Sequence, residues 1–296
     1  MRIAFDETRN NQVRSFVLVG FFIVLAGFMG ALLGIYWGSL YFGVGFSIIV
    51  AIVYSTIVFN TGDRMILSMS GAKEATKKDY PHLYHTIEGL AIAAGIPTPK
   101  AYVIEDSALN AFATGKNPKN ASVTVTTGLL KALNRQELEG VLAHEMSHIK
   151  NYDIRFMMLA TVLVGLVTLL SDFLLRSFLF GKRNRDGGNA TMILIAAGLL
   201  LAILSPIIGN ILRLAISRKR EFMADSSGAT LTRYPPGLAN ALRKIAGDPD
   251  PLVDKANHAT AHLFISTPFR KKKSFMDSLF ATHPPIEERI KRLEEM

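Results

Sequence analysis

Residues 144–148 read His-Glu-Met-Ser-His, the pattern H-E-x-x-H, and the rest of the chain is interpreted outward from them. In a helix, a spacing of four places His144 and His148 on one face, one turn apart, where their ring nitrogens can bind one Zn²⁺. Glu145 lies about 100° around such a helix. It can therefore reach water beside the metal without being a ligand, as a general base does. The alternative is a solvated helix with two incidental histidines.

The residues before this pattern favour a helix. Asn134 followed by Glu137 has the form of a capping box, in which each side chain bonds the other residue's backbone amide. Leu138, Val141 and Leu142 then supply an apolar stripe that leads into the histidine face. The helix is therefore expected to begin just after Asn134.

A catalytic zinc takes three protein ligands and keeps one open position. The longer pattern with a local third ligand is absent, because Asn151 and Ile154 stand where it requires Gly and His. Glu221 is the best distant candidate. Asp225, on the same helical face, could accept the second N–H of a ligand imidazole and fix the ring. The alternative for Glu221 is an ordinary surface carboxylate beside basic residues.

Composition restricts the chemistry and the partners. The 296 residues include no cysteine, so disulfides and thiolate ligands are excluded and a zinc site must use His and carboxylate. The formal net charge is +9, but no recognised nucleic-acid motif accompanies it. Lys and Arg flanking membrane spans explain this charge better, so we expect a bilayer and not nucleic acid as partner.

Residues 15–62 contain no charged side chain, and one span needs about 20 residues. We therefore predict a transmembrane hairpin that turns near residues 36–39. Basic residues lie at both of its ends, which places the N-terminal tail, residues 1–14, and the chain after the hairpin in the cytoplasm.

A second apolar stretch, residues 154–216, predicts a second transmembrane hairpin. Three basic residues in its middle oppose the positive-inside rule, so a partly inserted hairpin is the alternative. The polar segments 63–153 and 217–296 must then share one side and together form the catalytic domain. The fold class expected is a mainly α integral membrane protein, with two transmembrane hairpins and a zincin-like α+β catalytic domain.

A small sheet is expected beside the metal helix. Residues 101–105 and 123–126 have strand character, and residues 110–115 between them are predicted as a loop or an irregular sheet edge. Such an edge could bind an extended peptide, although the sheet could equally serve only to pack the helix. His283 precedes two prolines and an amphipathic helix, residues 286–295. From there it could donate to an oxyanion, or simply stand at the start of that helix.

The ordered set of motifs resembles the HtpX family, bacterial heat-shock membrane zinc endopeptidases related to the CAAX prenyl proteases. The resemblance rests on two apolar hairpins, Asn110-Ala111-Phe112-Ala113, the H-E-x-x-H, Glu221-Phe222-Met223-Ala224-Asp225, His283-Pro284 and Arg289. It implies one Zn²⁺ per chain, bound by His144, His148 and Glu221, with Glu145 as base. It further implies that His283 and Arg289 contact the transition state and that Asn110 contacts the substrate.

The same resemblance implies a function in membrane-protein quality control. The expected reaction is cleavage of misfolded or damaged membrane proteins at the cytoplasmic face of the cell membrane, as part of a stress response. Prenyl-protein processing is disfavoured, since that branch has seven spans and this chain has at most four. Two alternatives remain open: a processing peptidase with one dedicated substrate, and a non-catalytic membrane scaffold.

Overall fold

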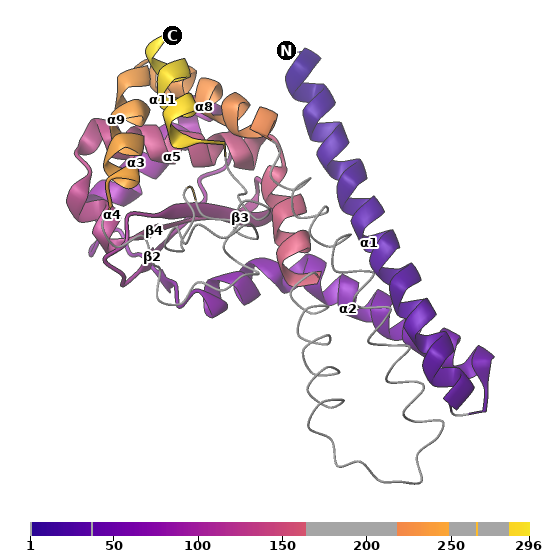
Figure 1. Ribbon diagram of the computed structural model, residues 1–296. Coiled ribbons are helices and arrows are strands. Elements are labelled where there is room, and N and C mark those ends of the chain that lie inside the picture. The colour runs from indigo at the N-terminus through magenta and orange to yellow at the C-terminus, as the bar shows by residue number, and fades with distance from the viewer. Residues whose placement is uncertain (1, 37, 164–217, 249–264, 266–283) are drawn as a thin grey trace.

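A hairpin of two long helices projects from a unit that combines helices with a sheet (Figure 1). The computed structural model describes residues 2–36, 38–163, 218–248, 265 and 284–296. The hairpin consists of α1 (Arg2–Tyr36) and α2 (Leu40–Met69), so its turn falls where the sequence predicts it. Helix α1 begins at Arg2, and the segment predicted as a tail is the first part of this helix.

Both hairpin helices are long and apolar enough to cross a membrane, over Arg9–Ala31 and Leu40–Met69. Large apolar side chains point outward from them, for example Phe16, which is 71% exposed. The helices pack closely through glycine: a Cβ on Gly43 would lie 2.2 Å from the carbonyl oxygen of Gly30. Small residues that let two backbones approach in this way are typical of helix pairs in membranes.

The sheet has four strands in the order β1-β2-β4-β3. They are β1 (Lys73–Glu74), β2 (Lys100–Ile104), β3 (Ala111–Asn117) and β4 (Asn120–Thr126). Strand β4 pairs parallel with β2 and antiparallel with β3, and the β3 register shifts between Gly115 and Asn117. The segment predicted as a loop or an irregular edge is therefore an edge strand, and the loop alternative is wrong.

Helix α5 (Arg135–Lys150) carries the H-E-x-x-H. It lies at the centre of the unit that contains the sheet, against the sheet and three other helices. Its predicted capping box is confirmed: the amide of Glu137 donates to Asn134 Oδ1 at 3.0 Å, and the amide of Asn134 donates to Glu137 Oε2 at 2.8 Å. Val141, Leu142 and Met146 are fully buried, so this helix forms part of the core.

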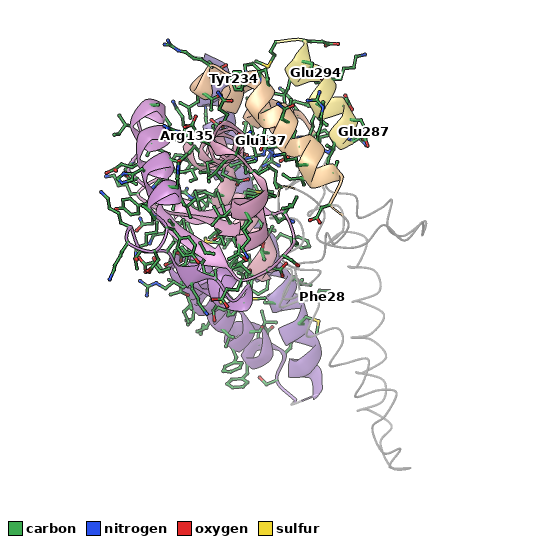
Figure 2. All side chains as sticks on the ribbon, turned by 90° about the vertical axis from the view of Figure 1, so that its left-hand side faces the viewer. Phe28, Arg135, Glu137, Tyr234, Glu287 and Glu294 are labelled. Atoms are coloured by element: carbon green, nitrogen blue, oxygen red, sulfur yellow. The ribbon has the colours of Figure 1, made fainter. Side chains whose placement is uncertain are left out.

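Further helices complete this unit: α3 (Pro81–Ala94), α4 (Thr127–Ala132), α8 (Arg218–Thr232), α9 (Pro235–Ala246) and α11 (Ile286–Glu294). Helices α3, α8 and α9 contact α5, α11 packs against α8 and α9, and α4 contacts β4. Figure 2 shows Tyr234, Glu287 and Glu294 at the end of the molecule formed by α9 and α11, away from Phe28 on the hairpin. Residues 153–163 are helical and largely buried. The rest of the predicted second hairpin, residues 164–216, lies outside the described residues.

Candidate metal centre

Helix α8 packs closely against α5 because Gly228 has no side chain where the two backbones meet. A Cβ on Gly228 would lie 2.9 Å from the backbone nitrogen of His144. Glu221, Asp225 and Gly228 follow the spacing i, i+4, i+7 and so share one face of α8. Both carboxylates on this face are only 3% exposed. The alternative that Glu221 is a surface carboxylate is therefore wrong.

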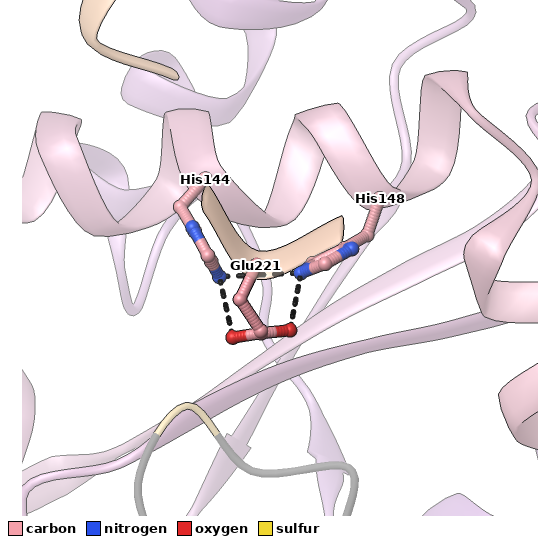
Figure 3. Close-up of side chains that lie close together, drawn as sticks. All are labelled: His144, His148 and Glu221. Atoms are coloured by element: carbon pink, nitrogen blue, oxygen red, sulfur yellow. Dashed lines mark hydrogen bonds and ion pairs between the residues drawn. The ribbon is translucent and has the colours of Figure 1, made fainter. Parts of the chain in front are cut away.

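The structure brings together the three residues predicted as ligands (Figure 3). The Nε2 atoms of His144 and His148 lie 3.2 Å apart. Glu221 places Oε1 3.5 Å from His148 Nε2 and Oε2 3.9 Å from His144 Nε2. Three ligands at 2.0–2.1 Å from a tetrahedral ion would be about 3.3 Å from one another. The observed separations bracket that value, so the donor set fits a zinc-sized ion.

The other nitrogen of each imidazole is held by a carboxylate. Asp225 Oδ1 lies 2.9 Å from His144 Nδ1, as the shared helical face suggested. Asp153 Oδ2 lies 3.0 Å from His148 Nδ1. Because each Nδ1 is engaged, each Nε2 is oriented toward the space between the rings. Sequence reasoning missed Asp153. The available signal was a lone acidic residue at the start of an apolar helix, where burial requires a partner.

Two buried arginines complete the arrangement. Arg289 is fully buried and donates to both oxygens of Asp225, at 2.8 and 2.7 Å. Its Nη1 also lies 3.6 Å from Glu221 Oε2. Arg220 lies 3.5 Å from Asp153 Oδ1. Each carboxylate that orients an imidazole is thus itself paired with a guanidinium group.

The cluster has an excess of negative charge. Glu145, Glu221, Asp225 and Asp153 are buried together with two arginines. With neutral imidazoles these side chains sum to a net charge of −2, which one divalent cation would neutralise. Burying such an excess without a counter-charge would be costly. The charge balance is therefore a second observation that fits a divalent metal ion.

The pKa values of the metal-free cluster reflect this charge. Burial raises the pKa of Glu145. Burial would lower the pKa of His148, but the hydrogen bond that it donates to Asp153 and the neighbouring carboxylates raise this pKa to about 9. Burial would raise the pKa of Asp225, but Arg289 and His144 lower it to about 2. In the absence of metal, a proton on His148 therefore supplies part of the missing positive charge.

Comparison with known proteins gives the same result as the geometry. Residues 77–296 match Peptidase family M48. The chain belongs to this family. Among its relatives, the Protease HtpX homolog of Dictyoglomus turgidum is 49% identical over 254 residues, which cover 86% of this chain and 82% of that protein. The homolog of Tropheryma whipplei is 43% identical over 97% of this chain and 96% of that protein.

The fold also matches a solved structure. The crystal structure of S. mikatae Ste24p superimposes with a TM-score of 0.53 at 19% identity, covering 98% of this chain and 67% of that one. Membership of family M48, together with the His-His-Glu group and the two apolar helices, makes this protein a membrane-associated metalloprotease. The expected fold class, mainly helical with a small sheet and membrane helices, is confirmed.

Two further residues were predicted to take part in the M48 site. Asn110 is buried directly before β3, where its backbone carbonyl accepts from the amide of Thr126 and its Oδ1 accepts from the amide of Ala111. The structure places it next to the edge strand that contacts α5 and not within that strand. His283 lies outside the described residues, so its predicted role in the transition state stays a prediction.

Proposed function

We propose that this protein is a zinc endopeptidase that hydrolyses misfolded or damaged membrane proteins at the cytoplasmic face of the cell membrane. The observation that carries the proposal is the convergence of His144, His148 and Glu221 beside the buried Glu145. Zinc is the metal best suited to two imidazoles and one carboxylate in a chain without cysteine. The HtpX names of the relatives support the protease class.

The residues divide the chemical work. His144, His148 and Glu221 would hold one zinc ion, which when bound supplies a Lewis acid toward water and the scissile carbonyl. Glu145 accepts a proton from the attacking water and passes it to the leaving amine. Burial raises the pKa of Glu145 above that of an ordinary glutamate, which favours its acceptance of a proton from water.

Other residues orient the reacting groups. Asp225 and Asp153 hold the imidazoles, and Arg289 holds Asp225 and Glu221 in place. We assign Arg289 this positioning role on its contacts, and a direct contact with the transition state remains a prediction. His283 is proposed to donate to the oxyanion.

The edge strand offers a binding mode for the substrate. An extended peptide could pair with the outward backbone groups of β3, with Asn110 directly before that strand. The amide of Ile265 already donates to the carbonyl of Ala111 there, at 2.9 Å. This contact demonstrates that the edge accepts backbone hydrogen bonds, and it means that a substrate must share the edge with Ile265 or displace it.

The first test separates catalysis from metal binding. Glu145→Gln should retain zinc but lose chelator-sensitive proteolysis of casein, whereas Glu221→Ala should lose zinc. Full proteolysis by the Glu145→Gln variant would remove the mechanism, and stoichiometric zinc in Glu221→Ala would exclude that residue as a ligand. Degradation of several unrelated unfolded proteins would favour quality control over a dedicated processing peptidase. A zinc-bound but inactive wild-type protein would favour a scaffold.

The orientation is tested by labelling. Lys150 and Lys219 are exposed. Lys150 comes shortly after the predicted ligand His148 and Lys219 shortly before the predicted ligand Glu221, and the chain has no cysteine of its own. Single cysteines at these two positions should both react from the cytoplasmic side with a membrane-impermeant thiol reagent. Reaction from opposite sides of the membrane would contradict a catalytic domain built from residues 63–153 and 217–296.

A further inference from the structure

Asn11, near the beginning of the first hairpin helix, is a fully buried polar residue that the proposed mechanism does not use. It lies on α1, within the apolar window that is able to cross a membrane. Its neighbour Asn10 is exposed. A buried amide on such a helix is unfavourable unless it is fully hydrogen-bonded, so its partners indicate what it is for.

Among the residues that the structure describes, the side-chain amide of Asn11 bonds to groups beside the metal centre. Its Nδ2 donates to Asp153 Oδ1 at 2.6 Å and to the carbonyl oxygen of Asn151 at 3.0 Å. Its Oδ1 accepts from Arg220 Nη1 at 3.4 Å. Both N–H groups and the carbonyl of this side chain are therefore engaged.

The two oxygens of Asp153 contact three neighbouring side chains. Oδ2 faces Nδ1 of the ligand His148, and Oδ1 accepts from Asn11 and Arg220. Without Asn11, the carboxylate could rotate and weaken the contact that orients the imidazole. Arg220 directly precedes the ligand Glu221 in the chain. Asn11 thus contacts Asp153, which bonds the ligand His148, and Arg220, which precedes the ligand Glu221 in the chain. Asp153 and Arg220 belong to different segments of the chain.

We propose that Asn11 is a positioning residue for the metal centre: it couples the first membrane helix, through Asp153, to the ligand His148. The proposal rests on the proposed function, since it takes His148 to be a ligand. It goes beyond that function because it makes metal affinity depend on the placement of α1. A movement of α1 along or away from the catalytic unit would then change how tightly the site holds its metal.

The test measures metal affinity and not proteolysis. The full-length chain is purified in detergent with Glu145→Gln present throughout, so that self-cleavage does not change the result. Zinc affinity is measured by competition with a coloured chelator for Asn11→Leu and for the matched control Asn10→Leu. We expect Asn11→Leu to weaken zinc binding about tenfold, which is the lower end of the range for removing a residue that orients a metal ligand. Asn10→Leu should leave zinc affinity unchanged.

A double-mutant cycle separates positioning from general destabilisation. If Asn11 acts through Asp153, the effect of Asn11→Leu on zinc affinity should disappear when Asp153→Asn is already present. The visible spectrum of the Co²⁺-loaded protein should also change in Asn11→Leu and not in Asn10→Leu. Asn11→Asp keeps the shape and gives a second variant, in which carboxylate repulsion should weaken zinc binding at least as much.

The outcomes distinguish this proposal from the proposed function. Unchanged zinc affinity in Asn11→Leu and Asn11→Asp would overturn the coupling while leaving the zinc site intact. Equal losses in the presence and absence of Asp153→Asn would also overturn it, because they would show a structural effect that does not pass through Asp153. Failure of the unsubstituted chain to bind zinc would instead refute the proposed function.

Discussion

Replacing Gly228 by alanine should disturb the metal centre although it changes no ligand. The new Cβ would lie 2.9 Å from the nitrogen and 3.2 Å from the Cα of His144. Both are backbone atoms of a helix, so they cannot rotate away. Helix α8 would have to move outward by about 0.5 Å to restore ordinary contact. Glu221 is carried on the same face of α8 and would move with it.

Two opposing effects set the expected magnitude. Overpacking of this kind costs about 1–3 kcal/mol, and alanine gains about 0.5–1 kcal/mol over glycine within a helix. The free energy of unfolding should therefore fall by about 0–2.5 kcal/mol. Metal–ligand distances tolerate only about 0.2 Å of error. A displaced Glu221 should accordingly weaken zinc binding about 10-fold to 100-fold, as the loss of a partner beyond the ligands does.

The control variant replaces a glycine at which a Cβ would meet no neighbouring atom of the described residues. Nothing lies within 4 Å of a Cβ on Gly89, in the middle of α3. Gly89→Ala should therefore keep zinc affinity and unfold at the same or a slightly higher denaturant concentration. Zinc affinity from chelator competition and unfolding midpoints of the metal-free protein would be compared for both variants. Wild-type zinc affinity in Gly228→Ala would refute the argument that close helix contact places Glu221.

Three further predictions concern the cap, the pH dependence and the buried arginine. Asn134→Ala removes the capping box of α5 and should lower the free energy of unfolding by about 0.5–2 kcal/mol in chemical denaturation. Because the pKa of His148 is raised to about 9 in the metal-free protein, zinc must displace its proton; the apparent Kd should fall about tenfold per pH unit from pH 7 to 9 and then level off. A Kd independent of pH would contradict protonation of His148. The same raised pKa stabilises the metal-free fold fully below the unfolded value of 6.5, and this stability should decline as pH rises through about 9. Arg289→Met leaves Asp225 buried without its guanidinium partner and should destabilise the protein by about 3–5 kcal/mol. Arg289→Lys should recover only part of this stability, because an ammonium cannot bond both oxygens of Asp225 as a guanidinium does. A wild-type unfolding midpoint in Arg289→Lys would show that the bidentate geometry does not matter.

The sequence was sufficient for features whose cause is local. The spacing of His144 and His148, the cap at Asn134 and the charge-free stretch of residues 15–62 each depend on neighbouring residues, and each predicted an element that the structure contains. Glu221 and Asp225 could be paired with each other for the same reason. Their meeting with α5 required the additional argument that both polar segments share one side of the membrane.

The missed residues act across long distances in the chain. Asn11 and Asp153 are 142 residues apart, and each looks unremarkable in its own segment. Arg220 belongs to a basic run expected to flank a span, yet it is buried, whereas its neighbours Arg218 and Lys219 are exposed. A sequence pattern gives the charge and the periodicity of a segment. It does not show which residue of a basic run is buried. For β3 the sequence left a loop and an irregular sheet edge open, because its alanines and glycine have weak strand character, and the structure shows the irregular edge.

The distribution of the charged residues over the chain explains why they are kept despite the cost of burial. The carboxylates and arginines of the cluster come from α5, from Asp153, from α8 and from α11. Each segment alone has an unbalanced charge, so none of them can form a stable site before the others arrive. The two arginines and a protonated His148 would compensate three of the four carboxylate charges without metal. A divalent metal ion that displaced this proton would complete the charge balance, so metal binding is expected to favour the assembled arrangement over a partly formed one.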